Sequence, residues 1–170
     1  MTSHPFNFKA LQWNANGLYR DKLHEFRHDL RSINPTAVFL CETHWRDEYT
    51  IKFSSFNVFP LNRPDKNGGG VAILIKKSIT ASILRLPCTP NIEAIGVKIQ
   101  LNNESLDLIS AYCPRGNCDR EEIERLFSAA SNKALICGDF NGHSPRWQSS
   151  CQRADRAGSA IQQVLDDDDH

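Results

Sequence analysis

The segment Ala134-Leu135-Ile136-Cys137-Gly138-Asp139-Phe140-Asn141 joins a short apolar run to a carboxylate and a carboxamide that stand two residues apart. The apolar run predicts a buried strand, and alternation along a strand directs the side chains of Asp139 and Asn141 the same way. Such a pair suits chemistry on phosphate, because one group can orient or deprotonate a water while the other holds a phosphoryl oxygen. The alternative is a simple turn, since Gly, Asp and Asn all favour turns.

The composition indicates a single globular domain. The chain has 170 residues, of which 40% are hydrophobic and 24% are charged, and this leaves no room for a second domain of ordinary size. No apolar run approaches membrane-spanning length, and the first residues do not resemble a secretion signal. We therefore expect a nuclear or cytoplasmic protein that is not secreted. None of the six cysteines forms a C-x-x-C pair, so we expect reduced thiols rather than a zinc cluster or disulfides.

The formal net charge is zero, with 20 basic and 20 acidic residues. This balance argues against a strongly basic clamp for nonspecific nucleic-acid binding. It does not exclude a nuclease, because a bound divalent metal adds local positive charge. Four consecutive aspartates precede the C-terminal histidine, and we interpret residues 166–170 as an acidic, solvated tail that follows the domain.

Hydrophobic periodicity predicts strands and helices in alternation. A helix over 119–130 has Asp119 as its N-cap, and Glu122 completes a capping-box pattern. The Gly68-Gly69-Gly70 cluster precedes a strand rather than a helix, so we interpret it as a tight turn and not as a phosphate loop. This order favours a layered α+β sandwich over a Rossmann fold. The other predicted helices cover 21–33 and 155–165, and the predicted strands cover 8–13, 37–41, 56–59, 70–75, 79–86, 94–101, 106–112 and 134–137.

Polar residues stand at the carboxyl ends of four of these predicted strands. They are Asn14, Glu42, Tyr112 and the pair Asp139 and Asn141. One such residue is commonplace, because strand ends are where polar groups belong. Together, however, they supply the oxygen ligands that Mg²⁺ prefers and the hydrogen-bonding groups that can grip a phosphodiester.

Five segments, in order, carry a family resemblance. The chain resembles the endonuclease/exonuclease/phosphatase superfamily, and within it the endonuclease of jockey-like non-LTR retrotransposons. The resemblance extends over residues 8–165, and five motifs in the same order are far more specific than one. The segments are QWNANGL at 12–18, CETHW at 41–45, GGGVAI at 68–73, SAYCP at 110–114 and GDFNGH at 138–143.

The resemblance implies a DNase I-like fold, in which two packed mixed sheets and their flanking helices form a four-layered α/β sandwich. It also implies a Mg²⁺ or Mn²⁺ cofactor, DNA as the substrate, and a nick whose 3′-hydroxyl primes reverse transcription. Glu42 then resembles the principal metal ligand, with Asn14 beside it. Asp139 resembles the residue that activates the attacking water, Asn141 the residue that holds the water and the scissile phosphate, and Tyr112 a hydrogen-bond donor to that phosphate.

Other residues near these motifs are weaker candidates. His143 and Trp147 resemble family positions near DNA, and Arg115 and Arg146 could each meet a phosphate. For all four, an ordinary surface position is the alternative. Trp45 is better explained by packing.

The chain departs from the superfamily at its end. Members continue past the last helix into further strands that carry an Asp-His pair, whereas this sequence stops at Asp169-His170 without the strand that would place such a pair. We therefore expect a domain that lacks its C-terminal strands, has much-reduced or no turnover, and tends to associate. The parent polyprotein is expected to carry a reverse transcriptase downstream. A phosphatase of the same superfamily and a non-enzymatic remnant that binds nucleic acid weakly remain the alternatives.

Overall fold

The computed structural model describes residues 7–47, 51–63, 68–102 and 104–168, which form two four-stranded sheets and three α-helices. β1 runs parallel to β2 and β7 runs parallel to β8, and the other neighbouring strands are antiparallel. No helix in these residues is long and apolar enough to cross a membrane. The first sheet has the order β1 (Ala10–Asn14), β2 (Ala37–Cys41), β4 (Val71–Lys76), β3 (Phe56–Leu61), and the second has β5 (Thr80–Leu84), β6 (Glu93–Leu101), β7 (Glu104–Tyr112), β8 (Ala134–Asp139).

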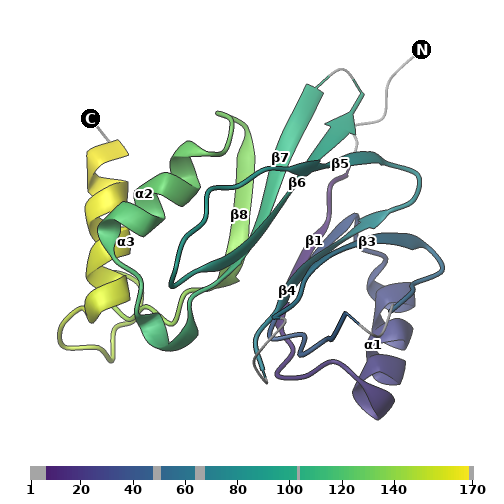
Figure 1. Ribbon diagram of the computed structural model, residues 1–170, viewed down its shortest axis with the longest axis horizontal. Helices are drawn as coiled ribbons and strands as arrows, with labels where there is room; N and C mark the ends of the chain where they lie inside the picture. The colour runs from purple at the N-terminus through teal and green to yellow at the C-terminus, as the bar shows by residue number, and fades with distance from the viewer. Residues whose placement is uncertain (1–6, 48–50, 64–67, 103, 169–170) are drawn as a thin grey trace.

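The two sheets pack face to face and helices cover both outer faces, which confirms the four-layered sandwich (Figure 1). α1 (Arg20–Ile33) covers the first sheet, and α2 (Arg120–Ser128) and α3 (Arg156–Asp168) cover the second. β2 is buried on both faces because it lies inside the stack. Its residues Val38 and Leu40 pack toward α1, and Ala37 and Phe39 pack between the sheets.

Several elements are longer than the sequence pattern indicates, and in β8 and α3 the added residues include polar residues that bear on the predicted site and tail. β8 ends at Asp139, two residues beyond the predicted end. Asn141 lies after the strand with a φ of 48°, so the strand alternation expected to align it with Asp139 does not apply. α3 extends to Asp168, so the aspartate run begins inside the helix, where Asp166 pairs with Arg146.

The N-terminus of α2 contains the predicted capping box. The Asp119 side chain accepts a hydrogen bond from the backbone N–H of Glu122, and the Glu122 side chain accepts one from the backbone N–H of Asp119. We expect Asp119→Ala to lower the free energy of unfolding by about 1 kcal/mol, because one helix donor loses its partner. Urea denaturation measures the loss. Asp119→Ser keeps an acceptor and should cost only a few tenths of that amount, and equal losses for both variants would contradict the capping role.

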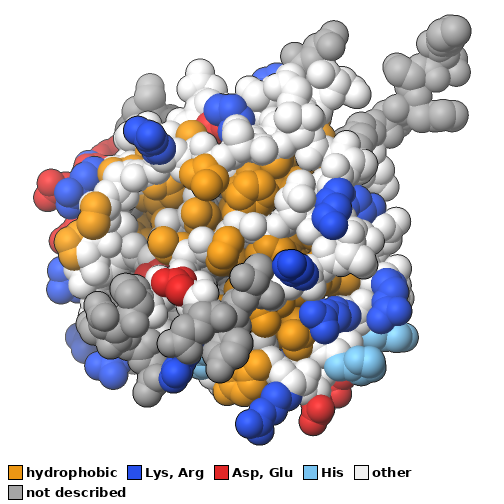
Figure 2. Space-filling model, turned by 45° about the vertical axis from the view of Figure 1, so that its right-hand side comes forward, with side chains coloured by type: hydrophobic (Ala, Val, Ile, Leu, Met, Phe, Trp, Pro, Cys, Tyr) orange, Lys and Arg blue, Asp and Glu red, His pale blue; other side chains and the backbone are white. Residues whose placement is uncertain are grey.

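One side of the molecule exposes apolar side chains at the sheet edges. Figure 2 shows apolar side chains gathered in the middle of the face, with Lys and Arg side chains around its margins. Leu61 of β3 is 41% exposed and Ile83 of β5 is 66% exposed. Both line one groove, so the edge strands of the two sheets border the same surface depression.

Candidate active site

The carboxyl ends of β1 and β8 meet across the two sheets. The side-chain amide of Asn14, the last residue of β1, donates hydrogen bonds to Glu42 Oε1 at 2.8 Å and to Asp139 Oδ2 at 2.7 Å. Its own Oδ1 accepts from the backbone N–H of Asn16. Asn14 therefore contacts both Glu42 and Asp139 directly. Asn14 and Asp139 lie 125 positions apart in the sequence.

Two buried hydrogen bonds fix the sheets to one another close to this point. The Cys41 thiol donates to the carbonyl of Ala111 at 3.3 Å, and the Ser110 hydroxyl donates to the carbonyl of Leu40 at 3.2 Å. Burial raises the pKa of Cys41 to about 11, so the thiol stays protonated and can donate at neutral pH. Because both bonds cross between the sheets, they hold the strand ends in a fixed relation.

The backbone at Glu42 is held in a strained conformation. Glu42 has a φ of 52°, a left-handed value that costs a residue with a Cβ on the order of 1–3 kcal/mol. The glycine turn stabilises the adjoining loop, because Thr43 N–H donates to Gly70 O at 3.1 Å. A Cβ on Gly70, whose φ is +82°, would lie 2.8 Å from Thr43 Oγ1. The three glycines have positive φ and lead into β4, and the carbonyls of Gly69 and Gly70 brace the Glu42 loop, a role that the sequence does not indicate.

The Tyr112 hydroxyl lies against the Glu42 carboxylate. Burial, the hydrogen bond to Glu42 and the charge of Glu42 together raise the pKa of Tyr112 to about 12. The phenol therefore remains protonated across the physiological range and acts as a hydrogen-bond donor. His44 Nε2 lies 3.6 Å from the other oxygen, Glu42 Oε2.

Asn141 contacts Asp139 through its backbone rather than its side chain. Its backbone N–H donates to Asp139 Oδ1 at 3.1 Å, and its side-chain Nδ2 donates to the carbonyl of Cys113 at 3.1 Å. Both oxygens of Asp139 are thus held, one by Asn141 and one by Asn14. The arrangement fixes the direction of the carboxylate and ties the loop after β8 to the loop after β7.

The four weaker candidates are exposed: His143, Arg146 and Trp147 follow β8, and Arg115 lies in a short 3-10 helix, Pro114–Gly116. Arg146 is in an ion pair with Asp166, and His143 Nδ1 lies 2.7 Å from Gln148 Oε1. Trp147 is 44% exposed and donates from Nε1 to the carbonyl of Gly142, and Arg115 is exposed with a φ of 59°. Contact of these side chains with DNA stays a prediction. Trp45, by contrast, is 7% exposed in the core, which confirms its packing role.

The sequence analysis missed a charged pair beside the site. Glu93 lies opposite Tyr112 in the β6–β7 ladder, and its carboxylate accepts hydrogen bonds from the Arg63 guanidinium and from the backbone N–H of Gly70 at 2.6 Å. Antiparallel pairing of two adjacent strands across a tight turn could have placed Glu93 opposite Tyr112. No sequence signal indicates Arg63, which follows β3.

The carboxylate oxygens of Glu42 and Asp139 are suitable ligands for a small hard cation. One nitrogen of Asn14 lies within hydrogen-bonding distance of two carboxylates, and within the described residues no Lys or Arg forms an ion pair with Glu42 or Asp139. Two carboxylates so close together repel each other, and a divalent cation relieves that repulsion. No group of three or more His, Cys, Asp or Glu suited to a metal occurs in the described part. Mg²⁺, which is commonly held by one or two carboxylates together with water, is compatible with this arrangement.

A family model described as the Endonuclease/Exonuclease/phosphatase family matches residues 11–154, which include Asn14, Glu42, Tyr112 and Asp139. The chain belongs to this family. The fold is shared with the endonuclease domain of TRAS1, a telomere-specific non-LTR retrotransposon, at a TM-score of 0.71 and 17% identity, over 94% of this chain and 70% of that one. An AP endonuclease from Archaeoglobus fulgidus matches at a TM-score of 0.65 and 19% identity, with the same coverage of both chains.

A similar curated protein is the RNA-directed DNA polymerase from mobile element jockey of Drosophila funebris. The two sequences are 27% identical over 155 residues, which amount to 90% of this chain and 17% of the polymerase. The protein described as "Probable RNA-directed DNA polymerase from transposon X-element" of Drosophila melanogaster is 26% identical over 160 residues, which are 92% of this chain and 17% of that protein. This chain thus spans about a sixth of the length of these relatives. The resemblance to jockey-like elements is confirmed.

Proposed function

We propose that this chain is a divalent-metal-dependent endonuclease that nicks one strand of DNA and leaves a 3′-hydroxyl. The observation that carries the proposal is the joint contact of Asn14 with Glu42 and Asp139 at the ends of strands from both sheets. Family membership and the similarity to retrotransposon polymerases support a phosphodiester as the substrate. The 3′-hydroxyl would prime reverse transcription by a polymerase in the same parent polyprotein, and this chemistry would take place on nuclear DNA.

The residues divide the reaction between them. Asp139, whose carboxylate is held by Asn14 and Asn141, accepts a proton from the attacking water, and Tyr112 donates a hydrogen bond to a phosphoryl oxygen. The water oxygen bonds to phosphorus, the bond from phosphorus to the 3′-oxygen breaks, and that oxygen takes up a proton from solvent. Glu42, with Asn14 beside it, would hold Mg²⁺ or Mn²⁺, and the metal would supply charge neutralisation at the phosphate.

Supercoiled plasmid tests the proposal. Incubation with Mg²⁺ or Mn²⁺ should give the nicked circle, and excess EDTA should prevent it. A DNA polymerase should extend the nicks directly, because they end in a 3′-hydroxyl. Release of phosphate from small phosphomonoesters with the plasmid intact would show a phosphatase instead. Binding without nicking at high protein concentration would show a non-enzymatic remnant.

The Tyr112 hydroxyl is expected to raise the rate without setting its pH dependence. Tyr112→Phe should slow nicking by roughly 10- to 100-fold, since one preorganised donor is lost. The pKa of Tyr112 in the folded protein is about 12, above its ordinary value of 10. The contribution of this raised pKa to stability is therefore complete below pH 10 and declines as the pH rises toward 12. Profiles of nicking rate against pH between 6 and 9 should therefore have the same shape in the wild type and in Tyr112→Phe. An inflection that is present in the wild type and absent from the variant would contradict this role.

A further inference from the structure

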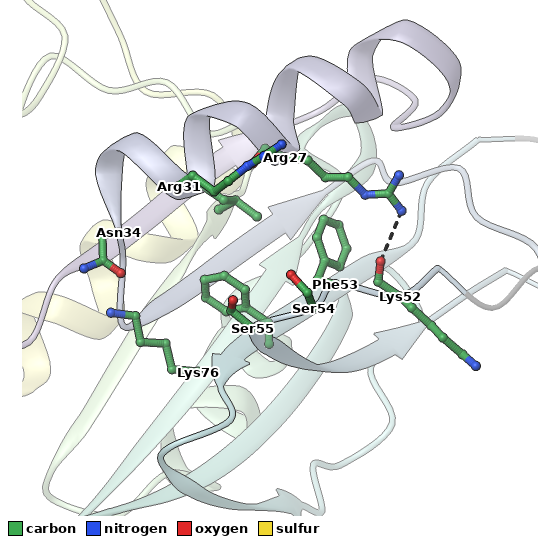
Figure 3. Close-up of a pocket in the computed structure, with 10 residues that line it drawn as sticks. Arg27, Arg31, Asn34, Lys52, Phe53, Ser54, Ser55 and Lys76 are labelled. Atoms are coloured by element: carbon green, nitrogen blue, oxygen red, sulfur yellow. Dashed lines mark hydrogen bonds between the residues drawn. The ribbon is translucent and has the colours of Figure 1, made fainter.

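A surface cavity lies at the opposite end of the first sheet from Glu42. It has a volume of about 530 Å³ and is formed between α1 and the segment that leads into β3 (Figure 3). Lys76 at its edge belongs to the far end of β4, whereas Val71 at the near end pairs with Cys41 beside the candidate active site. The five residues of β2 separate the two ends, so the cavity lies roughly 15 Å or more from the active site.

The charged side chains that line this cavity are all cations. They are Arg27 and Arg31 of α1, Lys52 and Lys76. Within the described residues none of the four takes part in an ion pair. A protein with a net charge of zero thus places Arg27, Arg31 and Lys76 at this cavity and Lys52 at its end, and an anion that binds there relieves the repulsion between these cations.

Contacts within the chain hold the two guanidinium groups in place without neutralising them. Arg27 lies 5.6 Å from the centre of the Phe53 ring and donates to the carbonyl of Lys52 at 3.1 Å. Arg31 donates from Nε to the carbonyl of Arg27 at 3.1 Å. Positioned guanidinium groups with free N–H donors suit phosphate oxygens.

Polar groups stand on both walls of the cavity (Figure 3). Arg31 lies along the helix, Lys76 extends toward Asn34 from the opposite wall, and Ser54 and Ser55 lie on the segment that faces the helix. The Lys52 ammonium points outward at one end. The cations therefore line an open groove rather than surrounding a single point, which suits an extended anion with several phosphates.

Among the residues that the structure describes, the groove offers no exposed aromatic face on which a base could stack. Phe53 and Phe56 are only 5% and 6% exposed and belong to the core. Contacts from the groove therefore go to phosphates and not to bases, and such contacts carry no sequence preference. We propose that the groove between α1 and β3 binds the phosphodiester backbone of a polynucleotide, at a site separate from the cleavage site. The choice of a polynucleotide over a small anion rests on the proposed nuclease function.

Binding of labelled oligonucleotides in EDTA, where no cleavage occurs, tests the groove. The double variant Arg31→Gln/Lys76→Gln should weaken binding about tenfold at 0.1 M salt, and the slope of log affinity against log salt should fall by roughly 0.7 per lost contact on a single strand. A matched control is Arg125→Gln/Lys133→Gln, which removes the same charge from exposed residues of the other half. The control should change affinity by less than about twofold.

Duplex DNA, single-stranded DNA and RNA of one sequence identify which polynucleotide occupies the groove. A selective loss for the groove variant with any of them supports the proposal. Equal losses for the groove and control variants, or no loss for either, would overturn it. Plasmid nicking separates this result from the proposed function. If the wild type nicks and the groove variant binds as well as the wild type, the groove proposal alone is refuted. If the wild type does not nick but the groove variant loses binding, the nuclease proposal alone is refuted.

Discussion

Replacing Glu42 with glutamine is expected to slow plasmid nicking by on the order of 1,000-fold or more. Glutamine keeps the shape of the side chain but removes the charge that would hold the metal. The carboxylate is already placed by Asn14 and by Tyr112, so the loss falls on the chemistry rather than on the fold. Single-turnover nicking over a range of Mg²⁺ concentrations measures the effect.

A control and a second readout make this prediction specific to the metal site. Glu121→Gln makes the same chemical change at an exposed position of α2, and it should leave nicking unchanged. Mn²⁺ should raise the Tm of the wild-type protein, because a ligand that binds only the folded state stabilises it, and this rise should disappear in the Glu42 variant. A variant that nicks within tenfold of the wild-type rate would rule out Glu42 as the principal ligand.

The substitution Gly138→Ala is expected to lower the free energy of unfolding by about 3 kcal/mol or more. A Cβ at this position would lie 1.8 Å from the carbonyl oxygen and 2.7 Å from the carbonyl carbon of Ala111. Ala111 is the residue paired with Gly138 in the parallel β7–β8 ladder, so backbone must move against backbone. Because Asp139 is the next residue, nicking should be lost together with stability.

Gly142→Ala provides the comparison for urea denaturation. Its added Cβ would lie 3.1–3.3 Å from its nearest neighbours in α3, a distance that small shifts can accommodate, so the cost should be about 1 kcal/mol. If Gly138→Ala were as stable as Gly142→Ala, the close approach of β8 to β7 described here would be wrong.

The sequence predicts features that depend on local signals. β2 occupies the predicted residues 37–41, because an apolar run buried on both faces has clear limits. The capping box at Asp119 forms as the spacing indicates. Polar residues at strand ends also converge as expected, since parallel neighbours such as β1 and β2 end at one edge. These signals lie within a few residues of the features that they predict.

Other features depend on how distant segments meet, and the sequence does not indicate them. Strand alternation does not align the Asn141 side chain with Asp139, because the chain turns to a left-handed conformation after Asp139, and contact of Asn141 with a phosphate stays a prediction. The Arg63–Glu93 pair joins residues 30 positions apart. The groove cations come from α1, the segment before β3 and the end of β4. Only the packing of α1 on the first sheet brings them together.

Glu42 follows β2 of the first sheet and Asp139 ends β8 of the second, and the amide of Asn14 links them across the interface. A slip of one sheet past the other by less than one residue's rise would part these groups while each ladder stayed intact. Strand scission would then fail before any change in helix or strand content became visible by circular dichroism. The catalytic rate should therefore respond to a misalignment of the two sheets that leaves the helix and strand content unchanged.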